Sequence, residues 1–111
     1  MTHTVYEYTD EQGRSPYAEW LWSPRDAKAR ARIIMQVDRM ELGLLGDSQP
    51  IGEGLSELRI HHGPGYRVYY GQTGKRVYLL LCGGDKSTQS KDIKRAKAYW
   101  REHQQRFSDD T

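Results

Sequence analysis

The sequence has little cysteine and few apolar residues. Its single cysteine, Cys82, excludes an internal disulfide and favours a reducing compartment. Apolar residues make up 36% of the chain, and no run approaches the roughly 18 consecutive apolar residues that a membrane-spanning helix needs. The N-terminus has no apolar segment behind a basic start, so we expect no secretory signal. These absences predict a cytoplasmic protein with no membrane partner.

The sequence also lacks a strong excess of either charge. Lys and Arg number 17 against 15 Asp and Glu, for a formal net charge of +2. Any anion site must therefore come from local clustering rather than from bulk charge. No Cys and His cluster has zinc-ligand spacing, and Gly52 to Gly54 lacks the flanking strand, the helix and the Lys-Ser/Thr tail of a phosphate-binding loop. We expect neither a metal nor a cofactor.

Residues 57–70, with the sequence E-L-R-I-H-H-G-P-G-Y-R-V-Y-Y, have the pattern of a β-hairpin. Two runs alternate apolar and polar side chains, as half-buried strands do, and Gly63-Pro64-Gly65 favours a tight reversal between them. A loop over 61–65 places Arg59 opposite Arg67. Like charges directly opposite destabilise a strand pair by about 0.2–1 kcal/mol, so this pair indicates a site that holds an anion.

The remaining pattern predicts two more strands and three helices. The expected elements are a strand at 4–9, helices that start at Ser15-Pro16 and Ser23-Pro24, a strand at 75–82 after a reversal at 71–74, and a last helix that starts within 87–90. Residues 44–54 have no periodicity and four punctuating Gly and Pro residues, so we expect a connecting loop there.

These elements predict a single α+β domain over residues 1–111, with about 107–111 as a disordered tail. The expected architecture has two layers, namely an antiparallel sheet (the first strand plus a three-strand meander) packed by the two N-terminal helices, with a C-terminal helix. The other face of the sheet is expected to be open. It would present Glu57, Arg59, Arg67 and Tyr69.

Three motifs resemble a family of bacterial toxins. They are G-E-G-L-S-E-L-R-I at 52–60, G-P-G-Y-R-V-Y-Y at 63–70, and L-L-C-G-G-D-K-S-T-Q-S-K-D-I-K-R-A at 80–96. In order and spacing they closely resemble the RelE/ParE superfamily of type II toxin–antitoxin toxins, and especially its HigB-like branch of phage-related addiction module killer proteins. The resemblance covers most of the chain and implies the RelE-type fold.

The resemblance implies a toxin that cleaves mRNA on the ribosome without a metal and so inhibits translation. Basic side chains would hold the scissile phosphate while the 2′-hydroxyl of the substrate attacks it. The implied partner is a cognate antitoxin, typically with a helix-turn-helix domain. Two alternatives stay open. One is a ParE-like inhibitor of DNA gyrase without nuclease activity, acting through its helices and C-terminal segment, where Trp20, Trp22 and the second helix would contact gyrase or simply an antitoxin. The other is a degenerate toxin kept for antitoxin binding.

By resemblance, the catalytic residues are Arg59, Arg67 and Lys86. Tyr69 is added as an auxiliary that matches no family position. Arg67 matches the phosphate-binding arginine of the family, and Lys86 matches a basic residue before the last helix. Where the family has a tyrosine in the last segment, this chain has Asp92-Ile93. Besides Tyr69, the candidates to replace that tyrosine are His61 and Asp85.

Each of these residues also has a purely structural interpretation. The two arginines could pair with Glu57 or Glu53 on a sheet face, where an exposed ion pair contributes about 0–1 kcal/mol. Tyr69 could stack on a base or pack across the strand pair. The sequence alone leaves these alternatives open.

Overall fold

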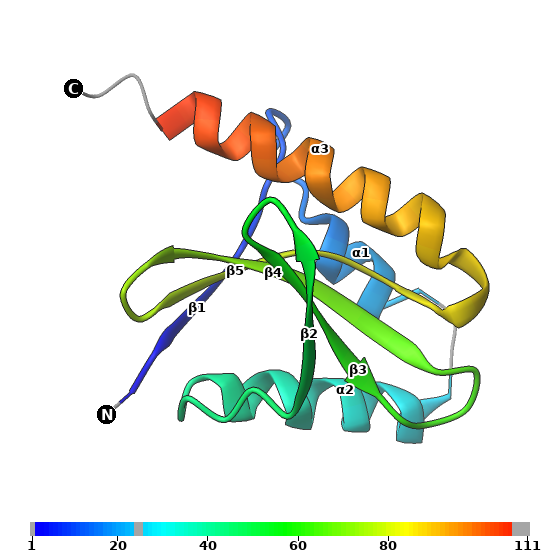
Figure 1. Ribbon diagram of the computed structural model, residues 1–111. Helices are drawn as coiled ribbons and strands as arrows, with labels where there is room; N and C mark the ends of the chain where they lie inside the picture. Colours follow the sequence, from blue (N-terminus) through cyan, green and yellow to red (C-terminus); the bar gives the residue numbers. More distant parts are fainter. Residues whose placement is uncertain (1, 24–25, 108–111) are drawn as a thin grey trace.

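A five-stranded sheet forms the centre of the computed structural model, which describes residues 2–23 and 26–107 (Figure 1). The elements in chain order are β1 (Thr4–Glu7), α1 (Pro16–Leu21), α2 (Ala27–Met40), β2 (Asp47–Gly52), β3 (Leu55–Ile60), β4 (Tyr66–Gly74), β5 (Val77–Asp85), a 3₁₀ helix (Lys86–Thr88) and α3 (Gln89–Phe107). The predicted α+β class with a C-terminal helix is confirmed. The predicted tail lies almost entirely in residues 108–111, outside the described residues.

The strand order is β1-β5-β4-β3-β2. Four of the strands form antiparallel pairs, but β1 runs parallel to β5 along the register Thr4↔Val77 to Glu7↔Leu80. The prediction of a wholly antiparallel sheet is therefore wrong at this edge. A parallel pair needs a long crossover connection, and here α1, α2 and three strands separate the two partners along the chain.

Side-chain caps fix the starts of the two N-terminal helices. Ser15 Oγ accepts a hydrogen bond from the Ala18 amide at 3.1 Å, which confirms the predicted start of α1. The α2 helix instead begins after Asp26, whose carboxylate accepts from the Ala29 amide at 2.7 Å. The predicted cap at Ser23 is therefore wrong, and Pro24 lies outside the described residues.

The β3–β4 hairpin has the predicted register, with Arg59 paired to Arg67 and Leu58 paired to Val68. Gly63 and Gly65 have φ values of 55° and 81° in the reversal. Glycine adopts such left-handed conformations without a steric penalty. The predicted juxtaposition of the two arginines is confirmed.

An additional strand, β2, lies where a loop was predicted over 44–54. It pairs antiparallel with β3 and forms one edge of the sheet. Pro50 lies within it, which an edge strand tolerates because one side of the strand has no hydrogen-bonding neighbour. Pairing with β3, rather than any local pattern, makes this segment a strand.

The β4–β5 hairpin reverses later than predicted. β4 continues to Gly74, and β5 extends to Asp85, so Gly83 and Gly84 lie inside a strand instead of ending it. A Cβ at Gly83 would lie 2.2 Å from Trp20 Cε3, and one at Gly84 would lie 1.8 Å from Asp92 Oδ2. These glycines permit close packing of helices on the strand.

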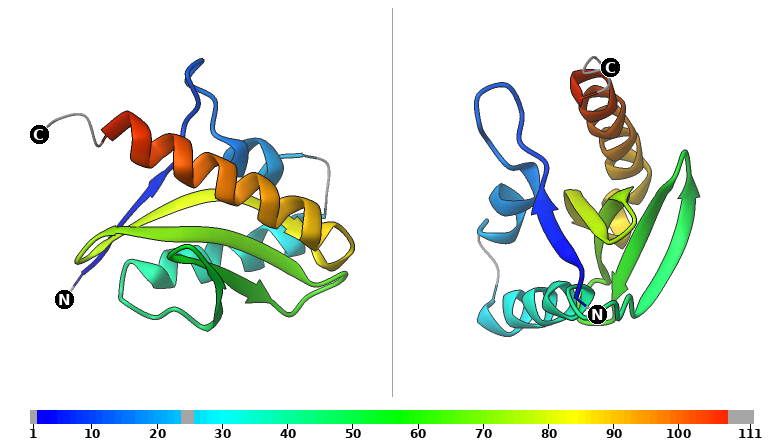
Figure 2. Two further views of the ribbon diagram at one scale, coloured as in Figure 1. Left: turned by 45° about the horizontal axis from the view of Figure 1, so that its top comes forward. Right: turned by 90° about the vertical axis from the view of Figure 1, so that its left-hand side faces the viewer.

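Helices cover both faces of the sheet, so the prediction of two layers with one open face is wrong. Figure 2 shows α2 and α3 on opposite sides of the strands. The core on the α1/α2 side includes Tyr17, Leu21, Ala29, Ile33, Met40, Leu58, Ile60, Tyr66, Val68, Tyr70, Tyr78 and Leu80. The core on the α3 side includes Tyr8, Leu55, Tyr69, Leu79, Leu81, Cys82, Ala96 and Trp100. Within the described ranges, no helix has the length and apolar character that crossing a lipid bilayer requires.

Candidate anion-binding site

Adjacent strands place Arg59 and Arg67 on the α3-facing side of the sheet, around the carboxylate of Glu57. Glu57 and Arg59 alternate along β3 and so share a face, and Arg67 is directly opposite Arg59 on β4. Arg59 Nε donates to Glu57 Oε2 at 2.8 Å, and Arg67 Nε donates to the same oxygen at 3.3 Å. One carboxylate therefore bridges the two facing cations, which removes much of their mutual repulsion.

Glu57 is a buried acid, only 1% exposed. Its second oxygen, Oε1, accepts a hydrogen bond from Gln89 Nε2 in the first turn of α3 at 2.9 Å. Burial by itself would raise the pKa of Glu57, but the hydrogen bonds from Arg59, Gln89 and Arg67 outweigh it and hold the pKa below the usual value. Glu57 is thus an anion at neutral pH.

The two arginines differ in exposure. The Arg59 side chain is 38% exposed and the Arg67 side chain 13%. Arg67 also donates from Nη1 to the Gly65 carbonyl oxygen at 3.3 Å. Arg59 makes its one hydrogen bond within the described residues through Nε, and its side chain is the more exposed of the two.

Lys86 lies beside this pair, at the start of the 3₁₀ helix that follows β5. The strand register pairs Tyr66 with Asp85, which brings the next residue, Lys86, to the start of β4. A Cβ at Gly65 would lie 3.7 Å from Lys86 Cβ and 3.9 Å from Arg67 Nη1. Lys86 is exposed. The structure therefore places Arg59 and Arg67 side by side and the base of the Lys86 side chain next to the hairpin loop before Arg67.

Tyr69, the fourth predicted residue, is fully buried beneath α3. Burial raises the pKa of its phenol, and the nearby carboxylates of Glu57 and Asp92 raise it further. The hydroxyl has no hydrogen-bond partner among the described residues. Two roles were considered for Tyr69, stacking on a base and packing across the strands. The structure supports packing, because α3 covers the face of the sheet that was expected to be open.

The other two candidates, His61 and Asp85, are engaged elsewhere. His61 Nε2 lies 2.7 Å from Asp47 Oδ2 at the sheet edge, and this hydrogen bond lowers the pKa of Asp47. Asp85 caps the 3₁₀ helix, accepting from the Ser87 amide at 2.8 Å.

Sequence reasoning missed two residues of α3. Gln89 completes the hydrogen bonding of Glu57, and the buried Asp92 accepts from the Thr88 hydroxyl and lies 3.6 Å from Arg95 Nη1. No local pattern marks Gln89, because its partner is far away in the sequence. Asp92 had a signal in its spacing, because it lies one turn before Ala96 and two turns before Trp100 on the buried side of α3. An acid on the buried side of a helix usually has a partner.

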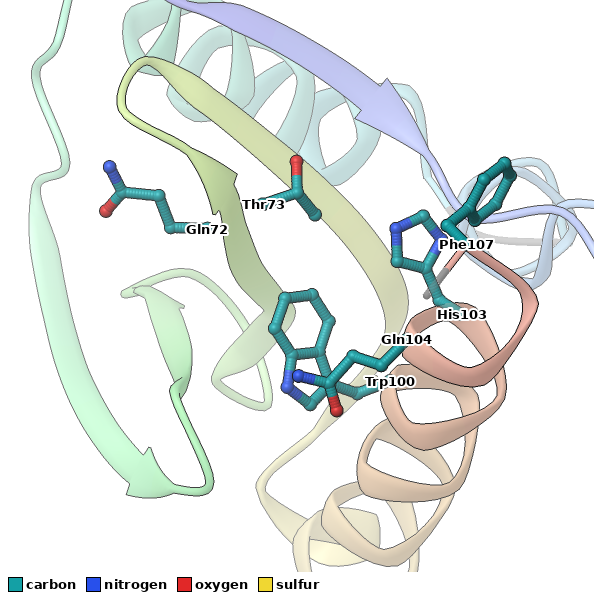
Figure 3. A pocket seen from close by; sticks show the side chains of 6 residues that line it. All are labelled: Gln72, Thr73, Trp100, His103, Gln104 and Phe107. Carbon is teal, nitrogen blue, oxygen red and sulfur yellow. The ribbon is translucent and has the colours of Figure 1, made fainter. Parts of the chain in front are cut away.

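None of the cavities described here is lined by Arg59, Arg67 or Lys86, although one of about 280 Å³ lies beside Lys86 and includes Asp85 and Thr88 in its lining. One cavity of about 350 Å³ lies between β4 and the C-terminal part of α3, lined by Gln72, Thr73, Trp100, His103, Gln104 and Phe107 (Figure 3). The arginine cluster contacts the other end of the same helix, at Gln89. Within the cluster, Arg59 and Lys86 reach the surface while Arg67 and Glu57 are largely buried. This arrangement suits an anion on a large partner better than an enclosed small molecule.

Together these features define an α+β protein with a cationic cluster at the end of a central hairpin. Residues 22–102 match the family model described as "Phage derived protein Gp49-like (DUF891)". A Haemophilus influenzae protein described as "Uncharacterized protein" is 44% identical over 81 residues, which cover 73% of this chain and 82% of that protein. The chain belongs to the phage-derived Gp49-like family. This membership is consistent with the predicted class of toxin–antitoxin toxin.

Proposed function

We propose that this protein is the toxin of a type II toxin–antitoxin system and inhibits translation as a ribosome-dependent mRNA endonuclease. The observation that carries the proposal is the pairing of Arg59 with Arg67 across the hairpin, with Lys86 beside the hairpin loop. Family membership supports the toxin class, and the RelE/ParE-like motifs support RNA as the substrate.

In the proposed reaction, the three cations bind the scissile phosphate and stabilise the charge that develops on it. The substrate's own 2′-oxygen forms the new bond to phosphorus and gives its proton to water. The bond to the 5′-oxygen breaks, and that oxygen takes a proton from water, which leaves a 2′,3′-cyclic phosphate and a 5′-hydroxyl. Such a reaction depends mainly on positioning and electrostatic stabilisation. Arginine suits this task because its planar guanidinium binds phosphate oxygens in a bidentate manner.

An antitoxin is the expected partner, because a cationic RNA site has to be silenced while the toxin is stored. We propose that an acidic segment of a small, helix-turn-helix antitoxin covers the arginine cluster. Its carboxylates would occupy the phosphate position.

The test is induced expression in a permissive bacterium, with separate pulse-labelling of protein, RNA and DNA synthesis. Arg59→Ala is the first variant, because Arg59 is the more exposed arginine and its loss leaves Glu57 bonded to Arg67 and Gln89. The matched control is Arg101→Ala, which removes an exposed arginine paired with Glu53. We expect the wild type and the control to stop protein synthesis first, and Arg59→Ala to restore growth. Full toxicity of Arg59→Ala would reject the proposal.

A gyrase inhibitor is the second candidate, and a surface outside the arginine cluster favours it. Trp22 is 64% exposed, and Arg30 of α2 lies 4.9 Å from the centre of its ring. Trp20, by contrast, packs on Gly83. If DNA synthesis falls first and Trp22→Ala abolishes toxicity while Arg59→Ala does not, this candidate replaces the nuclease.

A further inference from the structure

Glu57 is the residue of the cationic site that the proposed chemistry leaves without a role. It is an anion in a site meant for an anion, and a nearby negative charge weakens phosphate binding. It is nevertheless fully buried and accepts hydrogen bonds from Arg59, Arg67 and Gln89. An acid built this firmly into the site needs a structural or functional reason.

The arginine atoms that contact Glu57 indicate why it is there. Both arginines contact Glu57 Oε2 through Nε, which is the nitrogen closest to the side-chain stem. A guanidinium is planar and carries five N–H donors in a fixed arrangement, so fixing Nε also sets the direction of the four terminal N–H groups. One Arg67 terminal nitrogen contacts the Gly65 carbonyl. Arg59 uses only Nε in its hydrogen bond within the described residues. The Asp47 carboxylate, opposite Arg59 on β2, attracts this guanidinium without a hydrogen bond to it, so its terminal N–H groups remain available to an anion.

We propose that Glu57 is a positioning residue that holds Arg59 and Arg67 by their Nε atoms, so that their terminal nitrogens form a preorganised fork for a phosphate group. Gln89 holds the carboxylate from the opposite side and thereby links the fork to the first turn of α3. Preorganisation increases affinity because the side-chain entropy is lost on folding rather than on binding. The RNA origin of the phosphate rests on the proposed function, whereas the fork itself can be tested with inorganic phosphate.

The opposing model is that Glu57 only fills the anion position until a substrate phosphate displaces it. The two models differ in what the Nε–H groups do on binding. A positioning carboxylate keeps its hydrogen bonds to both Nε atoms when phosphate arrives, whereas a displaced carboxylate loses them.

The wild-type protein provides the first test, with inorganic phosphate as the probe and nitrogen-15 NMR of the arginine side chains as the readout. We expect phosphate to shift the terminal Nη signals of Arg59 while the Nε–H signals of Arg59 and Arg67 keep their positions and their slow exchange with water. Loss of slow exchange at these Nε–H groups on phosphate addition would overturn the proposal. This arm requires no variant to fold.

The second test compares Glu57→Gln with Glu53→Gln, which removes the same charge from an exposed ion pair with Arg101. We expect Glu57→Gln to bind phosphate about tenfold more weakly, because two arginines become mobile, and Glu53→Gln to bind as the wild type does. Equal or tighter phosphate binding by a folded Glu57→Gln variant would overturn the proposal.

The two proposals fail in different ways. Full toxicity of Arg59→Ala rejects the nuclease proposal, whatever the phosphate titration shows. If phosphate displaces the Glu57 carboxylate from the Nε–H groups, the proposed role of Glu57 is rejected, even when Arg59→Ala is not toxic.

Discussion

The two faces of the sheet are built differently. The face under α1 and α2 is packed with aliphatic and aromatic side chains such as Ile33, Leu58 and Val68, all fully buried. The face under α3 also has an apolar core, but it buries the acids Glu57 and Asp92 and the hydroxyl of Tyr69, which has no hydrogen-bond partner among the described residues. Burying polar groups costs free energy unless hydrogen bonds replace those to water.

This difference indicates that the two faces of the sheet have different roles. The α1/α2 face contributes stability by hydrophobic burial. The α3 face contributes less, because it buries charged groups, but it holds those charges in fixed positions. Glu57, Arg59 and Arg67 all project on the α3 side. Disrupting each face in turn should therefore separate stability from anion binding.

The largest stability effect is expected on the apolar face, from Leu58→Ala. Leu58 is 0% exposed in the core between β3 and the N-terminal helices. Truncating a buried leucine costs about 2–5 kcal/mol, because apolar contacts are lost and a cavity remains. Urea unfolding followed by circular dichroism measures this loss. Phosphate binding by the folded fraction should stay unchanged; a parallel loss of binding would show that the faces are not independent.

Gly83 and Gly84 offer a matched pair, because they are adjacent in β5 and face opposite sides. A methyl group at Gly84 would collide with Asp92, which is buried and held by Thr88, whereas one at Gly83 would collide with the half-buried ring of Trp20. Overpacking of this kind costs about 1–3 kcal/mol. We expect Gly84→Ala to be the more destabilising and to weaken phosphate binding, since it displaces the first turn of α3.

An equal effect of the two glycine substitutions on phosphate binding would contradict this comparison. If Gly83→Ala weakens phosphate binding as much as Gly84→Ala does, at equal loss of unfolding free energy, then the site responds to general destabilisation rather than to the position of α3.

A smaller effect should appear in the pH dependence of stability. The pKa of Glu57 is lower in the folded state than its usual value of 4.5. The unfolded chain therefore binds the proton more tightly, so Glu57 contributes stability above about pH 4.5 that is lost as the pH falls through the lower folded pKa. Urea unfolding at several pH values should show less acid destabilisation in Glu57→Gln than in the wild type. Identical pH profiles would mean that Glu57 is not held as an anion.

The hairpin that carries the site was predictable because its signals are local. Alternation over residues 57–70 and the Gly-Pro-Gly reversal were enough to give the register that places Arg59 opposite Arg67. Lys86 came from the motif resemblance, and its role stays a prediction; the structure places its Cβ near Gly65.

The missed features depend on partners that are distant in the sequence. β2 is a strand because it pairs with β3, although Pro50 and its glycines argue for a loop. Gly83 and Gly84 resemble a turn, yet they are glycines because Trp20 and Asp92 pack against them. The second face of the sheet is covered because α3 packs on it. The same packing buries Tyr69, which the sequence analysis expected to be exposed.

The smallest effect on stability is expected from Tyr69→Phe, and it decides between packing and chemistry at this position. The ring is fully buried and its hydroxyl has no hydrogen-bond partner among the described residues. Removing an unsatisfied buried hydroxyl should leave the free energy of unfolding unchanged or raise it by up to about 1 kcal/mol. Toxicity in the induced-expression assay should also stay at the wild-type level. A Tyr69→Phe variant that is fully stable but not toxic would restore the phenol to the reaction, and would require α3 to move aside when the substrate binds.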